Sequence, residues 1–183
     1  MPKISEEVIR EIFNSSLQAF LVQERQEILK GVNERNNCAR WGFYLESIAR
    51  EHGLTSYKAD PEYNRKQDGQ IKTIIDGQNR VVTINCDLIL HSRGNNTLED
   101  NLIAIEVKKH DQPSVEKNSD RERLRALTKS SFDGIWMNDG TAPPTHVCGY
   151  RLGVFVELNR KRRICSVEYF KDGEFESKFN HPF

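Results

Sequence analysis

The sequence predicts an α/β domain in which a mixed β-sheet is flanked by helices and preceded by an N-terminal helical segment. Apolar residues recur at helical spacing over the first fifty residues, and alternating apolar and polar residues, typical of strands, dominate the middle and the end. A second, shorter helical pattern separates two groups of strands. With 183 residues, we expect one domain covering 1–183, with an N-terminal helical extension at 1–32 and a core at 33–170.

Composition limits the classes of protein to which this chain can belong. Lys plus Arg and Asp plus Glu both number 27, so the formal net charge is zero and a polycation that coats nucleic acid is excluded. No apolar run approaches the roughly 18 residues that a membrane-spanning helix needs, and the N-terminus is acidic where a secretory signal would be basic. We therefore expect a soluble cytoplasmic protein without a membrane partner.

Cysteine and histidine spacing gives no transition-metal motif. The four cysteines form no CxxC pair, and the five histidines show no HExxH or HxxxH spacing. The sequence therefore predicts buried thiols, with neither a zinc ribbon nor a disulfide framework.

Two helices are predicted in the N-terminal third. The first covers 5–30 behind a Ser5 cap, with an interruption expected at 14–16. The second begins near Asn33, a favourable cap, and ends at Gly53, which suits the left-handed position after a helix. Five residues of this second helix share one narrow arc: Glu34, Cys38, Trp41, Leu45 and Ile48. Its buried stripe therefore carries a carboxylate at its N-terminal end.

Strand patterns occupy most of the remaining chain. Strands are expected at 56–64, within 80–94 after a turn at 76–79, and at 102–109. In the last of these, alternation places Ile103, Ile105 and Val107 on one face and Ala104, Glu106 and Lys108 on the other. A polar loop at 110–119, a short helix at 120–129, a hairpin of strands at 146–158 and 164–170, and a frayed C-terminus complete the prediction.

The strongest indication of chemistry is Asp87 followed by Glu106 and Lys108. Residues two apart on a strand point to the same face, and a hairpin partner can bring Asp87 beside this pair. Two adjacent carboxylates repel each other, and Mg²⁺ relieves that repulsion because it prefers carboxylate and water oxygens. The Lys108 ammonium could orient the attacking water and stabilise developing phosphate charge, as metal-assisted phosphodiester hydrolysis requires.

These residues resemble the PD-(D/E)xK nuclease superfamily, in small stand-alone prokaryotic or phage form, over about 33–158. Asp87 matches the first acidic position, Glu106 the second and Lys108 the lysine, while Cys86 replaces the eponymous proline. The resemblance implies a restriction-endonuclease-like core that places these residues on adjacent strands after a leading helix. It also implies a Mg²⁺-dependent nuclease in which Mn²⁺ can substitute, and it favours DNA over RNA as the substrate.

Many family members carry a glutamate on the leading helix that reaches the metal site. Glu34 is our candidate for this auxiliary ligand, and Glu46, about a third of a turn from the stripe, is the reserve. We expect the buried stripe of this helix to pack on the less apolar face of the sheet, which would bring Glu34 to the site; if it packs elsewhere, a basic residue such as Arg40 or Arg65 must neutralise it. A helix N-terminus also favours a glutamate through its dipole alone, which is the alternative interpretation.

Candidate nucleic-acid contacts follow from local charge. Residues 120–163 contain nine Lys or Arg and five Asp or Glu. The candidates beside the catalytic motif are Lys109, Arg121, Arg123 and Arg125. The run at 160–163 is the densest basic cluster. A solvated helix face explains the arginines at 121–125 equally well, and a charged hairpin tip that discourages edge pairing explains the run at 160–163 equally well.

Three functional hypotheses follow. The first is a metal-dependent endonuclease using Asp87, Glu106, Lys108 and Glu34. The second is a catalytically inactive nuclease-fold protein that binds nucleic acid or assembles with other proteins. The third is a homodimer or partner-protein contact through the apolar stripe of the N-terminal helix at 5–30, which can coexist with the first.

Overall fold

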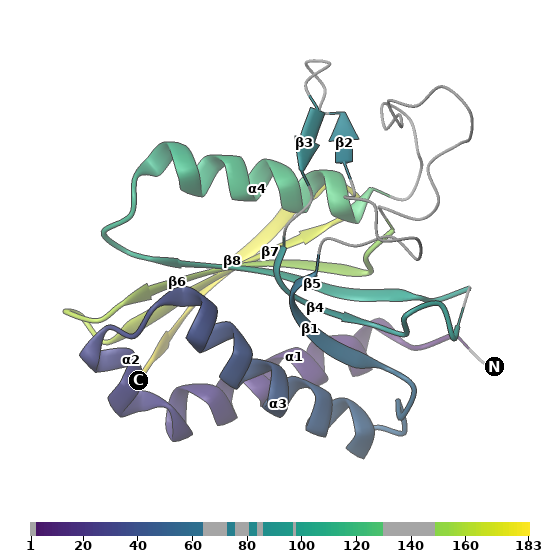
Figure 1. The fold of residues 1–183 in the computed structure, drawn as a ribbon, viewed down its shortest axis with the longest axis horizontal. Helices are drawn as coiled ribbons and strands as arrows, with labels where there is room; N and C mark the ends of the chain where they lie inside the picture. Colours follow the sequence, from purple (N-terminus) through teal and green to yellow (C-terminus); the bar gives the residue numbers. More distant parts are fainter. Residues whose placement is uncertain (1–2, 64–72, 76–80, 84–85, 97, 130–148) are drawn as a thin grey trace.

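The chain forms an α/β structure built around one mixed sheet. The computed structural model describes residues 3–63, 73–75, 81–83, 86–96, 98–129 and 149–183. A six-stranded sheet separates the helices α1 and α3 on one face from the helix α4 on the other (Figure 1). None of the helices described is both long and apolar enough to cross a membrane.

The predicted helix at 5–30 is two helices, α1 (Glu6–Gln23) and α2 (Arg25–Lys30). Ser5 caps α1 as predicted, because its side chain accepts a hydrogen bond from the Val8 amide. The expected interruption at 14–16 is wrong. The buried Ser16 hydroxyl donates to the Phe13 carbonyl and accepts from the Trp41 indole, so the helix tolerates this polar residue. The break lies instead at Glu24, the junction of the two helices.

The second predicted helix is confirmed as α3 (Glu34–Glu51). The Asn33 side chain accepts a hydrogen bond from the Asn36 amide at 2.8 Å, and Gly53 follows the helix with φ +80°. Of the apolar members of its stripe, Cys38, Trp41 and Leu45 are buried, and Ile48 is partly buried against the same core. The sequence therefore determines both ends of this helix.

The six-stranded sheet has the order β1-β4-β5-β6-β7-β8. Its strands are β1 (Lys58–Tyr63), β4 (Cys86–His91), β5 (Asn101–Lys109), β6 (Leu152–Asn159), β7 (Ile164–Lys171) and β8 (Glu174–Pro182). Only β5 and β6 are parallel among these neighbours, and α4 (Ser114–Thr128) lies in the crossover between them. The C-terminal ends of β5 and β6 therefore meet at the same edge of the sheet.

A separate two-stranded sheet pairs β2 (Thr73–Ile75) with β3 (Val81–Thr83). The predicted strand run at 80–94 is thus divided, since β3 pairs with β2 whereas β4 joins the large sheet. The predicted turn at 76–79 lies outside the described residues.

The two faces of the large sheet carry separate apolar cores. On one face, residues of α1 and α3 pack with Leu88, Leu90, Ile103, Ile105 and Val107. On the other, Leu124 and Leu127 of α4 pack with Cys86, Ile89, Ala104, Phe155 and Phe170. The predicted alternation along β5 is confirmed. In β4, Cys86 packs on the opposite face from Leu88, although residues two apart on a regular strand share a face.

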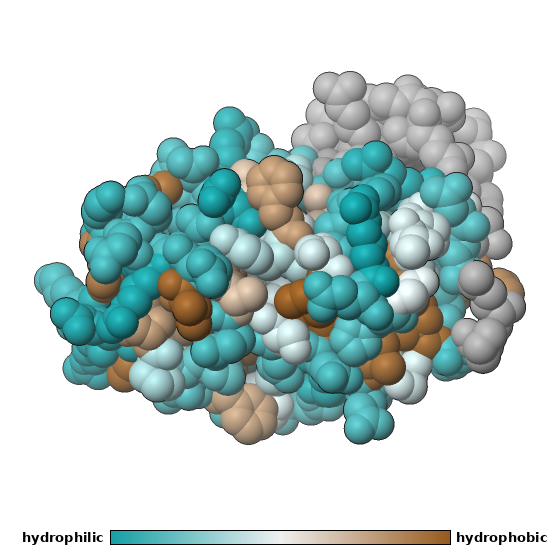
Figure 2. All heavy atoms as spheres, turned by 90° about the horizontal axis from the view of Figure 1, so that it is seen from below, coloured by the Kyte–Doolittle hydropathy of each residue, from teal (hydrophilic) through white to brown (hydrophobic). Residues whose placement is uncertain are grey.

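The N-terminal helix belongs to this core. Seven residues of α1 are buried: Ile9, Ile12, Phe13, Ser16, Leu17, Phe20 and Leu21. The apolar stripe on which we expected a second copy or a partner protein to dock is therefore already covered by the chain's own sheet and α3. Figure 2, which views this layer from outside, shows mostly hydrophilic residues with small separate hydrophobic groups.

Two further boundaries differ from the prediction. Helix α4 begins at Ser114, six residues earlier than expected, because its buried stripe starts with the charged residues Lys117 and Asp120 and only later becomes apolar. The C-terminus forms the strand β8 instead of fraying. The turn before it contains Asp172 (φ +51°) and Gly173 (φ +85°), the Asp-Gly pair that favours a tight hairpin.

Candidate functional site

Asp87 lies where β4 and β5 stop pairing. The antiparallel register runs from His91–Asn101 to Leu88–Ile105. Beyond that point the Val107 amide donates a hydrogen bond of 2.8 Å to Asp87 Oδ2. The carboxylate of Asp87 is therefore held between the two strands by the backbone of β5.

Lys108 lies at the centre of a cluster of carboxylates. Its Nζ is 3.5 Å from Glu34 Oε2, 3.6 Å from Asp87 Oδ2 and 3.4 Å from Asp120 Oδ2. Burial lowers the pKa of Lys108, but these carboxylates raise it more, and the net direction is upward. Lys108 is thus an ammonium at neutral pH and links residues from α3, β4 and α4.

Glu34 reaches this cluster from the N-terminus of α3. Its Oε1 accepts a hydrogen bond of 3.1 Å from the Lys109 amide, and its Oε2 faces Lys108. Asp87 Oδ2 contacts the same ammonium nitrogen, Lys108 Nζ. The separation between Glu34 Oε2 and Asp87 Oδ2 is therefore at most the sum of their two distances to Nζ, which is well below a Debye length of roughly 10 Å. The structure therefore places Glu34 beside Asp87.

The route by which Glu34 arrives differs from our expectation. We favoured packing of the α3 stripe on the less apolar face of the sheet, but Cys38 and Trp41 pack on the face of Ile105. Glu34 instead approaches the end of β5, where Lys108 can contact residues from both sides of the sheet. Of the two basic residues considered as its alternative partners, Arg40 pairs with Glu24, and Arg65 lies outside the described residues.

Glu106 faces α4 and is completely buried, with 0% of its surface exposed. Arg123 Nη1 donates to Glu106 Oε1 at 2.5 Å and to Asp120 Oδ1 at 3.0 Å. Burial, together with the charges of Asp87 and Asp120, raises the pKa of Glu106 well above its ordinary value despite Arg123. Burial also raises the pKa of Asp120, although Lys108 and Arg123 oppose the shift.

Among the residues that the structure describes, three buried polar atoms of this cluster have no hydrogen-bond partner: Glu106 Oε2, Arg123 Nε and Asp120 Oδ2, the last of which faces the Lys108 ammonium as an ion pair. Such atoms are rare in folded proteins, and each calls for an explanation by an ion, a water molecule or a functional role. The two carboxylate oxygens are acceptors, so they suit a cation or a water molecule.

The cluster holds more acidic than basic groups. Glu34, Asp87, Glu106 and Asp120 provide four carboxyl groups, whereas Lys108 and Arg123 provide two cations. Full ionisation would leave an excess of two negative charges, which a divalent cation or uptake of protons would neutralise. Asp87, Glu106 and Glu34 thus fit Mg²⁺ by donor type and by charge.

The present side-chain arrangement keeps these donors apart. Within the part of the chain that the structure describes, no group of three His, Cys, Asp or Glu side chains is arranged so that it could hold a metal ion. Lys108 lies among Glu34, Asp87 and Asp120, and Arg123 lies between Glu106 and Asp120. Coordination of a divalent cation would therefore require these two basic side chains to shift.

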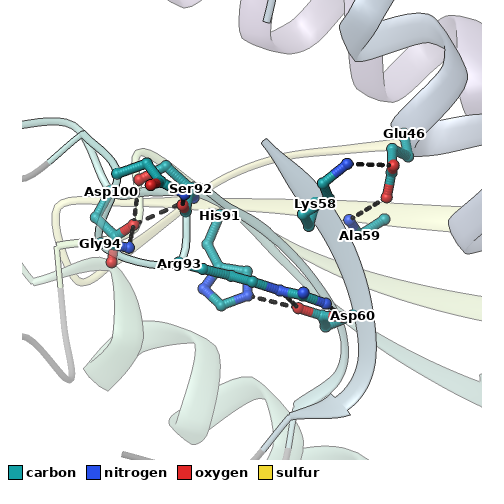
Figure 3. A network of polar contacts seen from close by, with 10 residues as sticks. Glu46, Lys58, Ala59, Asp60, His91, Ser92, Arg93, Gly94 and Asp100 are labelled. Carbon is teal, nitrogen blue, oxygen red and sulfur yellow. Dashed lines mark hydrogen bonds and ion pairs between the residues drawn. The ribbon is translucent and has the colours of Figure 1, made fainter. Parts of the chain in front are cut away.

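Glu46, the reserve for the helix-borne ligand, serves another purpose. Its carboxylate accepts hydrogen bonds from Lys58 Nζ at 3.0 Å and from the Ala59 amide at 3.3 Å (Figure 3). It also pairs with Arg50. These contacts attach α3 to the edge strand β1. In the same view Asp60 is held by His91 and Arg93. Glu46 is thus a structural ion-pair residue.

The arginines that we assigned to nucleic acid are engaged within the chain. Arg121 donates to both oxygens of Glu168 and lies over the Phe155 ring. Arg123 holds the buried carboxylates described above, and Arg125 pairs with the exposed Glu174. Contact of these three side chains with phosphate would require an exchange of partners. Lys109 is less constrained, since its Nζ donates only to the Gly31 carbonyl among the contacts described.

Asp120 is a cluster residue that the sequence analysis missed. We predicted a helix that begins at this residue, whereas Asp120 lies in the middle of α4 and is 4% exposed. The signal that could have identified it is spacing, because Asp120 precedes Leu124 by four residues and Leu127 by seven, on the inward face.

The predicted buried thiols are confirmed for Cys38, Cys86 and Cys165, while Cys148 lies outside the described residues. Burial and the nearby carboxylates of Asp87, Glu106 and Glu34 raise the pKa of Cys38 well above its ordinary value. This thiol next to the cluster is therefore neutral and a poor nucleophile.

We compared the chain with protein-family models, with curated proteins and with solved structures, and none of the three comparisons gave a match.

Proposed function

We propose that this protein is a Mg²⁺-dependent endonuclease that hydrolyses phosphodiester bonds of DNA. The observation that carries the proposal is the cluster in which Asp87, Glu106, Lys108 and Glu34 meet at the end of β5, with an excess of negative charge. The sheet order supports it as well. The first acidic residue and the ExK triplet lie on adjacent strands that follow the helix α3, as in a restriction-endonuclease-like core.

Each residue has a proposed role. Asp87 and Glu106 hold Mg²⁺, for which Mn²⁺ can substitute, and Glu34 supports the site directly or through water. When bound, the cation activates a water molecule and neutralises charge that develops on the phosphate. Glu106 offers Oε2, which has no hydrogen-bond partner among the described residues. Lys108 donates to the attacking water or to a phosphate oxygen and stabilises its negative charge.

The experiment that tests this function uses closed circular substrates. Purified protein is incubated with supercoiled duplex DNA and with circular single-stranded DNA in Mg²⁺, Mn²⁺ or EDTA. We expect nicked or linear products with either metal and none in EDTA, and conversion of closed circles identifies an endonuclease. Absence of cleavage of both substrates with both metals would contradict the proposal.

The second candidate is a catalytically inactive nuclease-fold protein that binds nucleic acid or other proteins. The observation that favours it is that Lys108 and Arg123 already pair with the carboxylates, which makes the cluster a candidate structural network. Titration of the protein with Mg²⁺ in a calorimeter discriminates the two functions. Saturable binding that the Asp87→Asn substitution abolishes favours the nuclease, whereas DNA binding without metal binding or cleavage favours the second candidate.

A further inference from the structure

The basic run Arg160–Arg163 lies at the same end of the sheet as the acidic cluster. Strands β5 and β6 are parallel, and Lys109 is in register with Leu158. The turn between β6 and β7 begins directly after this position, where β6 ends at Asn159. The run therefore follows the strand end that neighbours Lys108 and Lys109.

Direct contacts connect the turn to the cluster. The Arg160 guanidinium packs on Gly31, where a Cβ would lie only 2.1 Å from Nη1. The Gly31 carbonyl accepts a hydrogen bond of 3.1 Å from Lys109 Nζ, and the Lys109 amide donates to Glu34. The turn is thus connected to the acidic cluster through direct contacts, from Arg160 through Gly31 and Lys109 to Glu34.

The backbone of the turn is held in a defined conformation. The Arg162 amide donates to Asn159 Oδ1 at 3.1 Å, and the Arg163 carbonyl accepts from the Phe183 amide at 3.0 Å. Arg163 has a φ of +53°. The turn therefore presents its side chains from a fixed scaffold, which lowers the conformational cost of binding a ligand.

Few of the described carboxylates neutralise this turn. Among the described residues, the run forms one ion pair, in which Arg160 lies 4.0 Å from Asp111. The Asp111 side chain is 73% exposed. An exposed pair of this length contributes little. The arginines of α4 differ, since Arg121, Arg123 and Arg125 each pair with a carboxylate at 3.0 Å or less.

Protection of a sheet edge does not explain the run. Charged residues at edge strands discourage pairing with other chains. Here, however, β6 lies between β5 and β7, and β7 lies between β6 and β8. The turn joins two interior strands, so protection of a sheet edge does not account for its four cations.

We propose that Arg160–Arg163, together with Lys109, binds the phosphate backbone of DNA beside the acidic cluster. This inference rests on the proposed function for the identity of the polymer, and it moves the nucleic-acid surface from α4 to the β6–β7 turn. A row of cations on a fixed turn, with one long ion pair among the described residues, fits a phosphodiester chain, which carries regularly spaced charges. An acidic protein segment is the competing occupant.

The test compares two triple substitutions that remove equal charge. The first is Lys161→Gln, Arg162→Gln and Arg163→Gln. The control is Lys3→Gln, Arg50→Gln and Lys129→Gln. The control residues lie at the opposite end of the sheet. Lys3 precedes Ile4, whose amide donates to Glu99 just before β5; Arg50 is at the C-terminal end of α3; and Lys129 follows α4.

Affinity for a short fluorescein-labelled DNA duplex is measured by fluorescence anisotropy in EDTA over a series of salt concentrations. We expect the turn variant to bind more weakly, and its log–log salt slope to become shallower by about 0.9 for each phosphate that it no longer neutralises. The control variant, and an Arg121→Gln and Arg125→Gln double variant, should keep the wild-type slope. Thermal unfolding checks that each variant is folded.

Three results would overturn the inference: equal weakening by the turn and control variants, an unchanged slope in the turn variant, or binding of poly-glutamate in place of DNA. Because binding is measured in EDTA, its outcome is independent of cleavage. A protein that binds DNA through the turn but cleaves nothing with Mg²⁺ or Mn²⁺ would support the surface and contradict the nuclease.

Discussion

Arg123 donates a hydrogen bond of 2.5 Å to Glu106, a carboxylate with no exposed surface. The pair is incompletely satisfied within the described part of the chain, because Glu106 Oε2 and Arg123 Nε have no hydrogen-bond partner there. A buried ion pair costs much desolvation energy, and replacement by apolar residues is often neutral or stabilising. Stability alone therefore accounts poorly for the pair, and the proposed exchange of its counter-charge for a divalent cation would give it a role.

The first prediction concerns removal of this counter-charge. Arg123→Met should lower the free energy of unfolding in EDTA by about 3–5 kcal/mol, because it leaves Glu106 and Asp120 buried without their shared partner. Mg²⁺ should restore part of this stability by binding the excess carboxylates. Urea denaturation with and without Mg²⁺ measures both effects.

Arg125→Met provides the matched control for this prediction. Its ion pair with Glu174 is exposed, since 85% of the Glu174 side chain is accessible. The decrease in stability should be about 1 kcal/mol or less and independent of Mg²⁺. If the two variants were destabilised equally, or if Mg²⁺ stabilised both alike, Arg123 would have no special relation to the cluster.

The second prediction concerns Lys108. Lys108→Met should lower the rate of DNA cleavage by about 10²–10³-fold, the range observed when one preorganised donor to developing negative charge is removed. DNA binding in EDTA should change little, because the β6–β7 turn is retained. Initial rates of plasmid nicking and anisotropy measure the two properties.

Lys58→Met is the control for Lys108. Lys58 is another partly buried lysine that pairs with a carboxylate, Glu46, but it lies on β1. This variant should cleave at nearly the wild-type rate. Wild-type cleavage by the Lys108 variant would exclude the proposed role of the ammonium.

The third prediction concerns pH and Glu168. Burial raises the pKa of Glu168, but hydrogen bonds from Arg121 and Lys178 lower it more, so the folded-state pKa lies below the ordinary value. A depressed pKa stabilises the fold above the unfolded-state pKa, and this contribution disappears as pH falls through the folded-state pKa. Glu168→Gln should therefore destabilise the protein by about 1.5–3 kcal/mol at neutral pH.

The same variant should converge with the wild type in acid. Below the folded-state pKa both side chains are neutral, so their free energies of unfolding should approach each other in denaturation curves that extend below about pH 4. A difference that stays constant over the whole pH range would show that packing, not charge, determines the effect.

Local signals in the sequence were sufficient for several elements. Asn33 and Gly53 determine the ends of α3 because capping and the left-handed conformation depend on single residues. The alternation from Ile103 to Lys108 determines which side chains of β5 face α4. These local rules also brought Asp87, Glu106 and Lys108 together as a candidate site.

Long-range contacts account for what could not be predicted. The helix break occurs at Glu24, whose carboxylate is held by Arg40 and Tyr44 from α3, and no local pattern indicates this contact. Asp120 joins the cluster because α4 packs across β5. The first buried residues of α4 are charged, and helical periodicity is recognised from apolar residues, so the sequence did not indicate where this helix begins.

The last prediction tests the packing that positions α4 over the sheet. Gly153 on β6 lies beneath this helix, and an added Cβ would lie 2.8 Å from Thr128 Cγ2 and 3.3 Å from Phe170 Cβ. Gly153→Ala should therefore push α4 away from the sheet and cost about 1–3 kcal/mol of stability. Because α4 carries Asp120 and Arg123, we also expect weaker Mg²⁺ binding in calorimetry.

Gly42→Ala is the matched control, a glycine in the interior of α3. An added Cβ there would be 3.5 Å from Leu88 Cδ1, an ordinary van der Waals contact. Alanine favours the helix, so this variant should gain about 0.5–1 kcal/mol. Opposite signs of the two changes in urea denaturation would confirm that α4 packs tightly on β6. A neutral or stabilising effect of Gly153→Ala would show that α4 has room to move. The packing of α4 on β6 would then not be what holds Arg123 next to Glu106.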